Sequence, residues 1–107
     1  MKKSNNTENF DCPLARAAIL IGKRWTLEIL RDLSLHKARR YQDFQNSLEG
    51  ISPNTLSERL KSLETAGIIS RQSYQEHPPR SEYILTQKGQ DLGPVLSAIH
   101  AWGKKYL

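Results

Sequence analysis

The sequence predicts a mainly α-helical domain that contains one small β-hairpin. Apolar residues recur at helical spacing over most of the chain, and a segment with two prolines separates two alternating, β-prone runs. In addition, the short stretch EGIS joins two of the helical segments. A helix, a glycine-containing turn, a second helix and then a hairpin form the layout of a winged helix-turn-helix.

Length and composition indicate one globular domain. The chain has 107 residues, enough for one modest hydrophobic core. Its longest apolar run, Ala17 to Ile21, is too short to cross a membrane, and its polar start lacks the apolar segment of a secretory signal. We therefore expect a cytoplasmic protein with no membrane partner. We expect residues 1–10 to form a mobile tail and residues 11–107 to form the folded domain.

The net charge of +5 favours an anionic partner, with nucleic acid as the first candidate. The excess of positive charge lies in the first part of the chain. Residues 1–40 hold nine Lys or Arg against four Asp or Glu, whereas residues 41–107 hold seven of each. Composition alone therefore does not mark any one helix as the element that contacts DNA.

The first half of the chain predicts three helices. They are expected over residues 13–21, 24–35 and 41–48, with the basic connector HKARR before the third. The apolar face of the second helix consists of Thr26, Ile29, Leu30 and Leu33. The inward face of the third consists of Tyr41, Phe44 and Leu48.

Strong local signals mark the start of the fourth helix. Gly50 can adopt the left-handed conformation that closes a helix. Ser52 is a good N-cap, and Pro53 suits the first turn. We expect this helix to end at Gly67, with three leucines towards the core: Leu56, Leu60 and Leu63.

A hairpin and a long helix complete the domain. The runs IISRQSY and EYILT flank the turn segment QEHPPRS, which predicts two strands joined by a stiff tip. From Thr86 we expect one long helix, bent by Pro94 in its interior. Its apolar stripe consists of Leu92, Val95, Leu96, Ile99, Trp102 and Tyr106.

Short polar side chains gather at the start of the fourth helix, on the side away from its leucines. In a helix-turn-helix, this part of the second helix meets base edges in the major groove. Asn can bond bidentately to adenine, Glu can accept from cytosine, and Ser or Thr can do either. The candidate DNA-binding residues here are Ser52, Pro53, Asn54, Thr55, Ser57, Glu58 and Lys61. A merely solvated helix face would have a similar composition.

Basic side chains around this helix are candidates for phosphate contacts. They are Arg39 and Arg40 in the connector, and Arg71, His77 and Arg80 in the hairpin. The alternative for the connector is a pair of solvated arginines, and Arg71 could instead pair with Glu82. Arg59 lies beside the leucine face, where a partly buried structural role and a DNA contact are both open.

Together these segments resemble the HxlR family of bacterial winged helix-turn-helix transcription regulators. The matching pieces are CPLARAAILIGKRWTLEIL, RRYQDFQNSLEGISPNTLSERLKSLETAGIISR, PPRSEYILTQKGQDLGPVL and HAWG, which lie within residues 12–103. The chain departs from the family at two places. It has KRW at 23–25 where the family often has Gly-Lys-Trp, and RY at 40–41 where the family often has Arg-Phe.

The resemblance implies a homodimer that binds a pseudo-palindromic operator in duplex DNA, with the first and last helices forming the dimer interface. The apolar stripe of the last helix agrees, because it is long for so small a domain. The expected dimerisation residues are Leu14, Ala18, Leu96, Ile99, Trp102 and Tyr106.

The single cysteine, Cys12, stands where some members of this family sense oxidants or electrophiles. It precedes the first helix and lies close to Arg16, and both features can lower the pKa of a thiol. A redox sensor and an inert cysteine remain alternatives. One cysteine also excludes an internal disulfide.

Two other classes of function fit the sequence poorly. An enzyme or a metal site would need clustered ligands or a nucleophile with its base, whereas His36, His77 and His100 are scattered. We therefore expect no metal and no cofactor. A winged helix that binds only protein would need neither the basic connector nor the polar helix face, and its binding to duplex DNA would not show a steep salt dependence.

Overall fold

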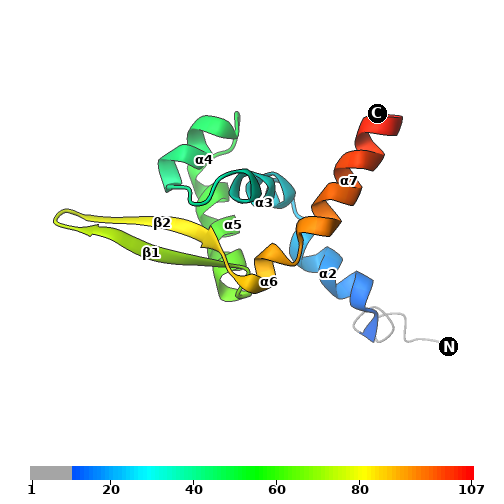
Figure 1. Cartoon of the computed structure of the whole chain (residues 1–107), viewed down its shortest axis with the longest axis horizontal. Helices are drawn as coiled ribbons and strands as arrows, with labels where there is room; N and C mark the ends of the chain where they lie inside the picture. The colour runs from blue at the N-terminus through cyan, green and yellow to red at the C-terminus, as the bar shows by residue number, and fades with distance from the viewer. Residues whose placement is uncertain (1–10) are drawn as a thin grey trace.

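The computed structural model describes residues 11–107, so the tail expected over residues 1–10 lies outside the described residues. Its helices are α2 (Pro13–Ile21), α3 (Thr26–Leu35), α4 (Tyr41–Ser47), α5 (Pro53–Thr65), α6 (Gln87–Gln90) and α7 (Gly93–Tyr106). The strands β1 (Ile69–Glu76) and β2 (Pro79–Leu85) pair antiparallel. Figure 1 shows α3, α4 and α5 grouped together, the hairpin extending to one side, and α2 and α7 on the other. The expected mainly α-helical winged helix-turn-helix is confirmed.

The core lies between α3, α4, α5 and the start of β1. The apolar faces predicted for α3 and α5 are all buried. The buried hydrophobic residues are Ile29, Leu30, Leu33, Phe44, Leu48, Ile51, Leu56, Leu60, Leu63, Ile68 and Ile69. Because the leucines of α5 point into this core, the rotation of α5 about its own axis is fixed.

The corner between α4 and α5 forms as the sequence predicts. Gly50 has φ 95°, a conformation that glycine adopts without a steric penalty. The Ser52 hydroxyl accepts a hydrogen bond from the backbone N–H of Thr55 at 3.1 Å, and Pro53 occupies the first turn. The start of α5 is therefore held in place by local interactions.

The hairpin is longer than expected. The expected turn segment QEHPPRS contributes residues to both strands, since β1 continues to Glu76 and β2 begins at Pro79. Proline can lie in this strand because each strand of a two-stranded hairpin has an unpaired edge. The register shifts between Ser73 and Gln75. The Ser73 hydroxyl bonds there to the carbonyls of Gln75 and Arg80.

The prediction of a single long helix after Thr86 is wrong. The structure has a short α6 and a separate α7, and Pro94 lies in the first turn of α7, where its missing N–H costs no helical hydrogen bond. Thr86 caps α6 through a bond from the N–H of Gly89 at 3.2 Å. A Cβ on Gly89 would lie 2.2 Å from the carbonyl oxygen of Ile68, so this close approach of α6 to the residue before β1 requires glycine.

A buried ion pair joins α3 to the connector. Asp32 is 5% exposed, and its carboxylate lies 3.3 Å from the Arg39 guanidinium and accepts a bond from the Ser47 hydroxyl at 2.5 Å. Arg39 also donates to the carbonyl of Asp43 at 3.4 Å. Its backbone pairs with that of Tyr83 in β2 through bonds of 3.0 and 2.7 Å. The connector is therefore fixed to α3, α4 and the hairpin, and Arg39 is neither a free nor a solvated arginine.

Removing either charge of this pair should destabilise the fold. Arg39→Gln leaves the buried Asp32 carboxylate without its cation, which should lower the free energy of unfolding by about 3 kcal/mol. Urea denaturation measures the loss. Lys37→Gln removes an exposed charge from the same connector and should change stability by no more than about 0.5 kcal/mol. Equal stability of the two variants would refute a structural role for the pair.

Candidate nucleic-acid interface

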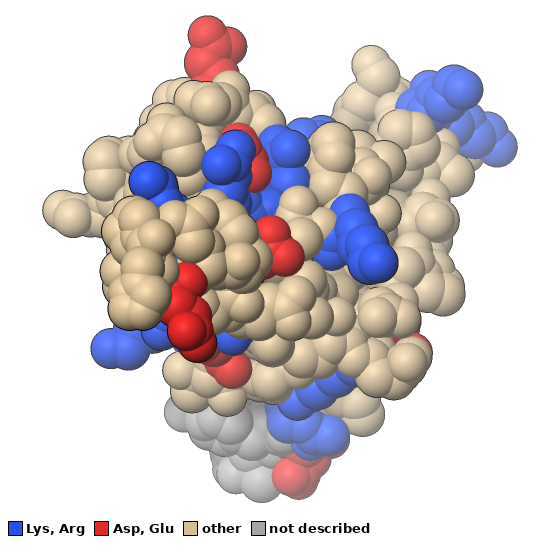
Figure 2. Space-filling model, turned by 60° about the vertical axis from the view of Figure 1, so that its left-hand side comes forward, with Lys and Arg blue, Asp and Glu red and all other residues tan. Residues whose placement is uncertain are grey.

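Basic and acidic side chains are interspersed on the side of the molecule that carries the hairpin. In Figure 2 this side comes forward, and lysine and arginine side chains lie at several places on it with acidic side chains between them. No continuous basic patch is visible in this view. A surface for nucleic acid must therefore be located from individual side-chain interactions and hollows, because overall charge does not mark one.

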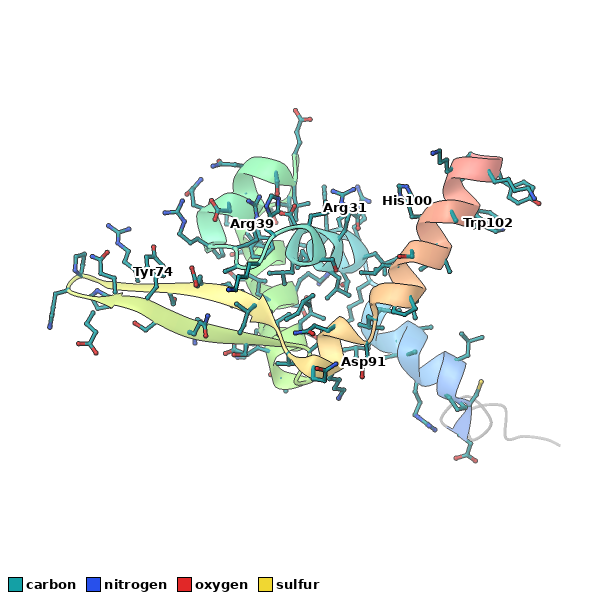
Figure 3. All side chains as sticks on the ribbon, in the orientation of Figure 1. Arg31, Arg39, Tyr74, Asp91, His100 and Trp102 are labelled. Carbon is teal, nitrogen blue, oxygen red and sulfur yellow. The ribbon has the colours of Figure 1, made fainter. Side chains whose placement is uncertain are left out.

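One hollow lies between the N-terminus of α4 and the hairpin. It has a volume of about 450 Å³, and Arg40, Tyr74 and Arg80 are among its lining residues. Tyr74 projects from the hairpin (Figure 3). Arg40 bonds to Asp43 through its backbone N–H at 2.9 Å and its side chain at 3.3 Å, and the backbone bond is the main reason that the pKa of Asp43 is lowered. In this hollow Arg40 and Arg80, which are far apart in the sequence, lie near each other.

The exposed face of α5 carries Asn54, Ser57 and Lys61, as expected. Thr55 is half-buried, and its hydroxyl accepts a bond from the Ser52 hydroxyl at 2.9 Å. Asn54 and Lys61 form no side-chain hydrogen bond or ion pair with any of the residues 11–107. Their polar groups are therefore available to an external partner.

Glu58 and Arg59 are engaged within the protein. Arg59 donates from Nε to the carbonyl of Arg24 at 2.8 Å and also pairs with the Glu58 carboxylate. Lys23 lies 3.8 Å from the same carboxylate. The side chain of Arg59 is only 19% exposed. The sequence left open a structural role and a DNA contact for Arg59, and the geometry favours the structural role. A base contact by Glu58 would compete with its ion pairs to Arg59 and Lys23.

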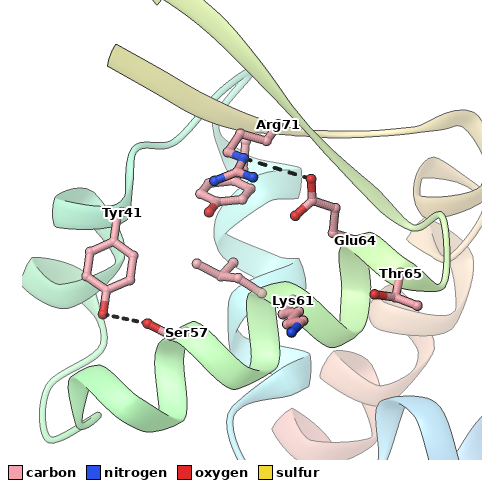
Figure 4. A pocket seen from close by; sticks show the side chains of 8 residues that line it. Tyr41, Ser57, Lys61, Glu64, Thr65 and Arg71 are labelled. Carbon is pink, nitrogen blue, oxygen red and sulfur yellow. Dashed lines mark hydrogen bonds and ion pairs between the residues drawn. The ribbon is translucent and has the colours of Figure 1, made fainter. Parts of the chain in front are cut away.

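Tyr41 is a site residue that the sequence did not identify. It was expected to face inward like Phe44, but it is half-buried, and its hydroxyl donates to the carbonyl of Pro53 at 3.0 Å. The same hydroxyl lies 3.2 Å from that of Ser57 (Figure 4). Tyr41 therefore braces the first turns of α5 from α4. The available signal was the tyrosine at 41, where phenylalanine is common in the family that the sequence resembles.

A second hollow, of about 480 Å³, lies between α5, Tyr41 and the base of the hairpin. Figure 4 shows Ser57, Lys61 and Arg71 around it. Arg71 Nε lies 3.9 Å from a carboxylate oxygen of Glu64 on α5, so its partner is not Glu82. Glu64 also lines this hollow and offsets part of the charge of Arg71, so Lys61 and the hydroxyl groups are the groups best suited to an anionic chain such as a DNA backbone.

The remaining basic candidates lie in different places. His77 is exposed at the hairpin tip, between β1 and β2. Arg39 is turned inward towards Asp32 and is not part of either hollow. Arg40 and Arg80 are consequently the connector and hairpin arginines best placed for phosphate contacts.

Helices α2 and α7 contain no buried residue. Leu14 is 78% exposed, Trp102 is 58% exposed and Tyr106 is 61% exposed. Ala18 and Ile99 are exposed as well, whereas Leu96 packs partly against the core. The ring centroids of Trp102 and Tyr106 lie 5.4 Å apart. A cluster of exposed apolar side chains such as this one is typical of an interaction surface.

Cys12 is exposed and occupies the N-cap position of α2. Its side chain forms no capping hydrogen bond, and its carbonyl accepts the backbone N–H of Arg16 at 3.0 Å. The thiol is therefore accessible to reagents in solution.

Within residues 11–107 no group of three His, Cys, Asp or Glu side chains is arranged to hold a metal ion. None of the helices in this range combines the length and apolarity needed to cross a membrane.

Comparison with known proteins gives a consistent result. A family model described as HxlR-like helix-turn-helix matches residues 20–107. The HTH-type transcriptional regulator sll1512 from Synechocystis sp. is 42% identical over 96 residues, which cover 90% of this chain and 70% of that protein. The structure of the redox regulator HypR in its oxidized form is similar with a TM-score of 0.83 and 28% identity, covering 90% of this chain and 98% of the other. Reduced YodB from B. subtilis is similar with a TM-score of 0.76 and 35% identity, covering 89% of this chain and 93% of the other.

Proposed function

Because the chain belongs to the HxlR-like helix-turn-helix family, whose members are transcriptional regulators and not enzymes, we propose that it binds specific sequences in duplex DNA. It does so as a homodimer on a pseudo-palindromic operator, in the cytoplasm. The observation that supports this most directly is the exposed face of α5, where Asn54 and Lys61 have no partner within the described residues. That face adjoins a concave surface suited to a phosphate chain.

The first turns of α5 enter the major groove. The leucine face of the helix is buried in the core, so its opposite face meets the base edges. Asn54 is suited to a bidentate bond with adenine, and Lys61 to a bond with guanine. Ser57 lies beside them, held by Tyr41.

Phosphates on either side of the groove are bound by the connector and the hairpin. Arg40 and Arg80 line one hollow, and Lys61 and Arg71 line the other. Contacts of this kind set the position of the protein on DNA without selecting its sequence.

The dimer forms through α2 and α7. Two copies of α5 can read a pseudo-palindrome only if a twofold axis relates them, and half-sites lie about one turn of DNA apart. The apolar stripe of Val95, Ile99, Trp102 and Tyr106 is exposed in the single chain, and a second copy would cover it.

Cys12 supports a second element of the proposal, a response to oxidants. The thiol is exposed and precedes α2, one of the two dimerisation helices. HypR, which is similar over most of this chain, is named a redox regulator. Oxidation of a cysteine here would change how the two subunits, and hence the two α5 helices, are spaced.

Asn54→Ala and Lys61→Ala should weaken binding to an operator selected from random duplexes, each by about 1–3 kcal/mol if the side chain bonds a base edge. Their circular dichroism should match the parent, because both side chains are exposed. Gln90→Ala alters an exposed amide on α6 and should bind as the parent does. If both α5 variants retain parental affinity, the recognition face has been misassigned.

Arg40→Gln and Arg80→Gln should each lower specific and non-specific affinity about equally. Each should also reduce the slope of log K against log salt by about one unit, because one phosphate contact is lost. Fluorescence anisotropy at several salt concentrations gives the slopes. Lys37→Gln removes a charge from a different hollow, which Gln72 and Glu82 also line, and should not change the slope. Slopes unchanged in both arginine variants would remove these residues from the interface.

Trp102→Ala and Ile99→Asp should shift the protein from dimer to monomer and lower operator affinity, because a monomer engages only one half-site. Analytical ultracentrifugation measures the shift. Lys104→Glu introduces a negative charge on the same helix, about 160° from Trp102 and about 140° from Ile99 on a helical wheel, and should leave the dimer intact. A parent protein that is monomeric at micromolar concentration would contradict the dimer.

Mild oxidation should change operator affinity reversibly, and Cys12→Ser should abolish the response while keeping the affinity of the reduced parent. Mobility-shift titrations with diamide, and then with added dithiothreitol, test this. Identical affinity of oxidised and reduced parent protein would mean that Cys12 is inert.

A further inference from the structure

A groove runs between α3 and α7, and its smaller hollow meets the proposed dimer surface at Ile99. Two adjoining hollows form it, one of about 450 Å³ and one of about 170 Å³. The hollows share three lining residues, Arg31, Leu96 and His100. The larger one is also lined by Ser34, Leu35, Gly93 and Ser97. Its volume is within the range of sites for small organic molecules.

Two nitrogen-bearing side chains flank this groove from opposite walls. Arg31 belongs to α3 and His100 to α7, and Figure 3 shows both in the space between the two helices. Within residues 11–107, neither side chain forms a hydrogen bond or an ion pair. The groove therefore presents a permanent positive charge that nothing in the described chain neutralises.

One carboxylate lines the smaller hollow, and it is already paired. Glu28 lies 3.4 Å from the Arg24 guanidinium, one turn earlier on α3. The larger hollow has no acidic lining residue. A ligand with a negative charge would thus meet Arg31 without repulsion from an unpaired carboxylate.

The larger hollow contains no residue of the proposed dimer stripe, and Ile99 of that stripe lines the smaller hollow. His100 and Trp102 are two residues apart, which places them about 160° apart around a helix. Figure 3 shows His100 towards α3 and Trp102 on the other side of α7. Leu96, one turn before His100, packs partly against the core and forms an apolar floor. Pairing through Trp102 therefore does not require the groove to be filled.

We propose that this groove is a binding site for a small organic carboxylate with an apolar body. The guanidinium of Arg31 would hold the carboxylate in a bidentate pair, and an N–H of His100 would add a hydrogen bond. Leu35 and Leu96 would contact the apolar body, and Ser34 and Ser97 line the same hollow. The occupant would touch α3, which belongs to the core, and α7, which belongs to the proposed dimer surface.

The test uses 1-naphthoate as the probe and the neutral 1-naphthalenemethanol as its isostere. Each is titrated into the full 107-residue protein without DNA, and ¹H–¹⁵N spectra report which amides shift. Because no DNA is present, this titration can succeed or fail whether or not the protein binds an operator. We expect naphthoate to shift amides of α3 and α7 with a dissociation constant of about 1 mM or below, and the alcohol to bind at least about tenfold more weakly.

Arg31→Gln should weaken naphthoate binding about tenfold or more, and Arg31→Lys should lose less, since it keeps the charge. Both variants alter an exposed side chain, so their thermal unfolding should match the parent. Lys37→Gln removes one positive charge elsewhere and should bind naphthoate as the parent does. The proposal is overturned if naphthoate produces no shifts in α3 and α7, if the alcohol binds equally well, or if Arg31→Gln binds like the parent.

Discussion

The buried ion pair between Asp32 and Arg39 is the contact on which the relative placement of α3, α4 and the hairpin depends. Asp32 is almost fully buried, and a carboxylate in that environment requires a cation and hydrogen-bond donors. Arg39 and Ser47 supply them. Because the backbone of Arg39 also pairs with Tyr83, satisfying this one carboxylate fixes the connector against the second strand. The hairpin is thereby held beside the helices instead of extending freely from α5.

That placement gives α5 its surroundings. The leucines of α5 fix its rotation, Tyr41 braces its first turns, and the hairpin base lies along one side of its exposed face. Arg59 and Glu58 are used to tie α5 to the segment before α3. The polar residues near the start of α5 therefore divide into a structural group and a free group. Asn54 and Lys61 belong to the free group, on which the proposed base recognition rests.

The sequence predicts the core of α3 and α5 well because their leucines and isoleucines recur at helical spacing on one face, whereas the same spacing on α2 and α7 leaves an exposed apolar stripe. It predicts the corner at Gly50 and Ser52 for a similar reason, since both signals are local. The role of Arg39 could not be obtained in this way, because a basic residue in a connector suits water, phosphate or a buried acid equally. The only hint was Asp32, an acid beside the buried Leu33. The close approach of Gly89 in α6 to Ile68 is likewise a tertiary contact, which helical spacing does not predict.

The central claim is that two copies of α5 read a symmetric DNA sequence. Selecting bound fragments from a random duplex library with the purified protein, and then sequencing them, tests this claim most directly. The account predicts an enriched pseudo-palindrome whose half-sites lie roughly 34–36 Å apart, about one turn of DNA. Failure to enrich any motif, or enrichment of a single half-site without a symmetric partner, would contradict it.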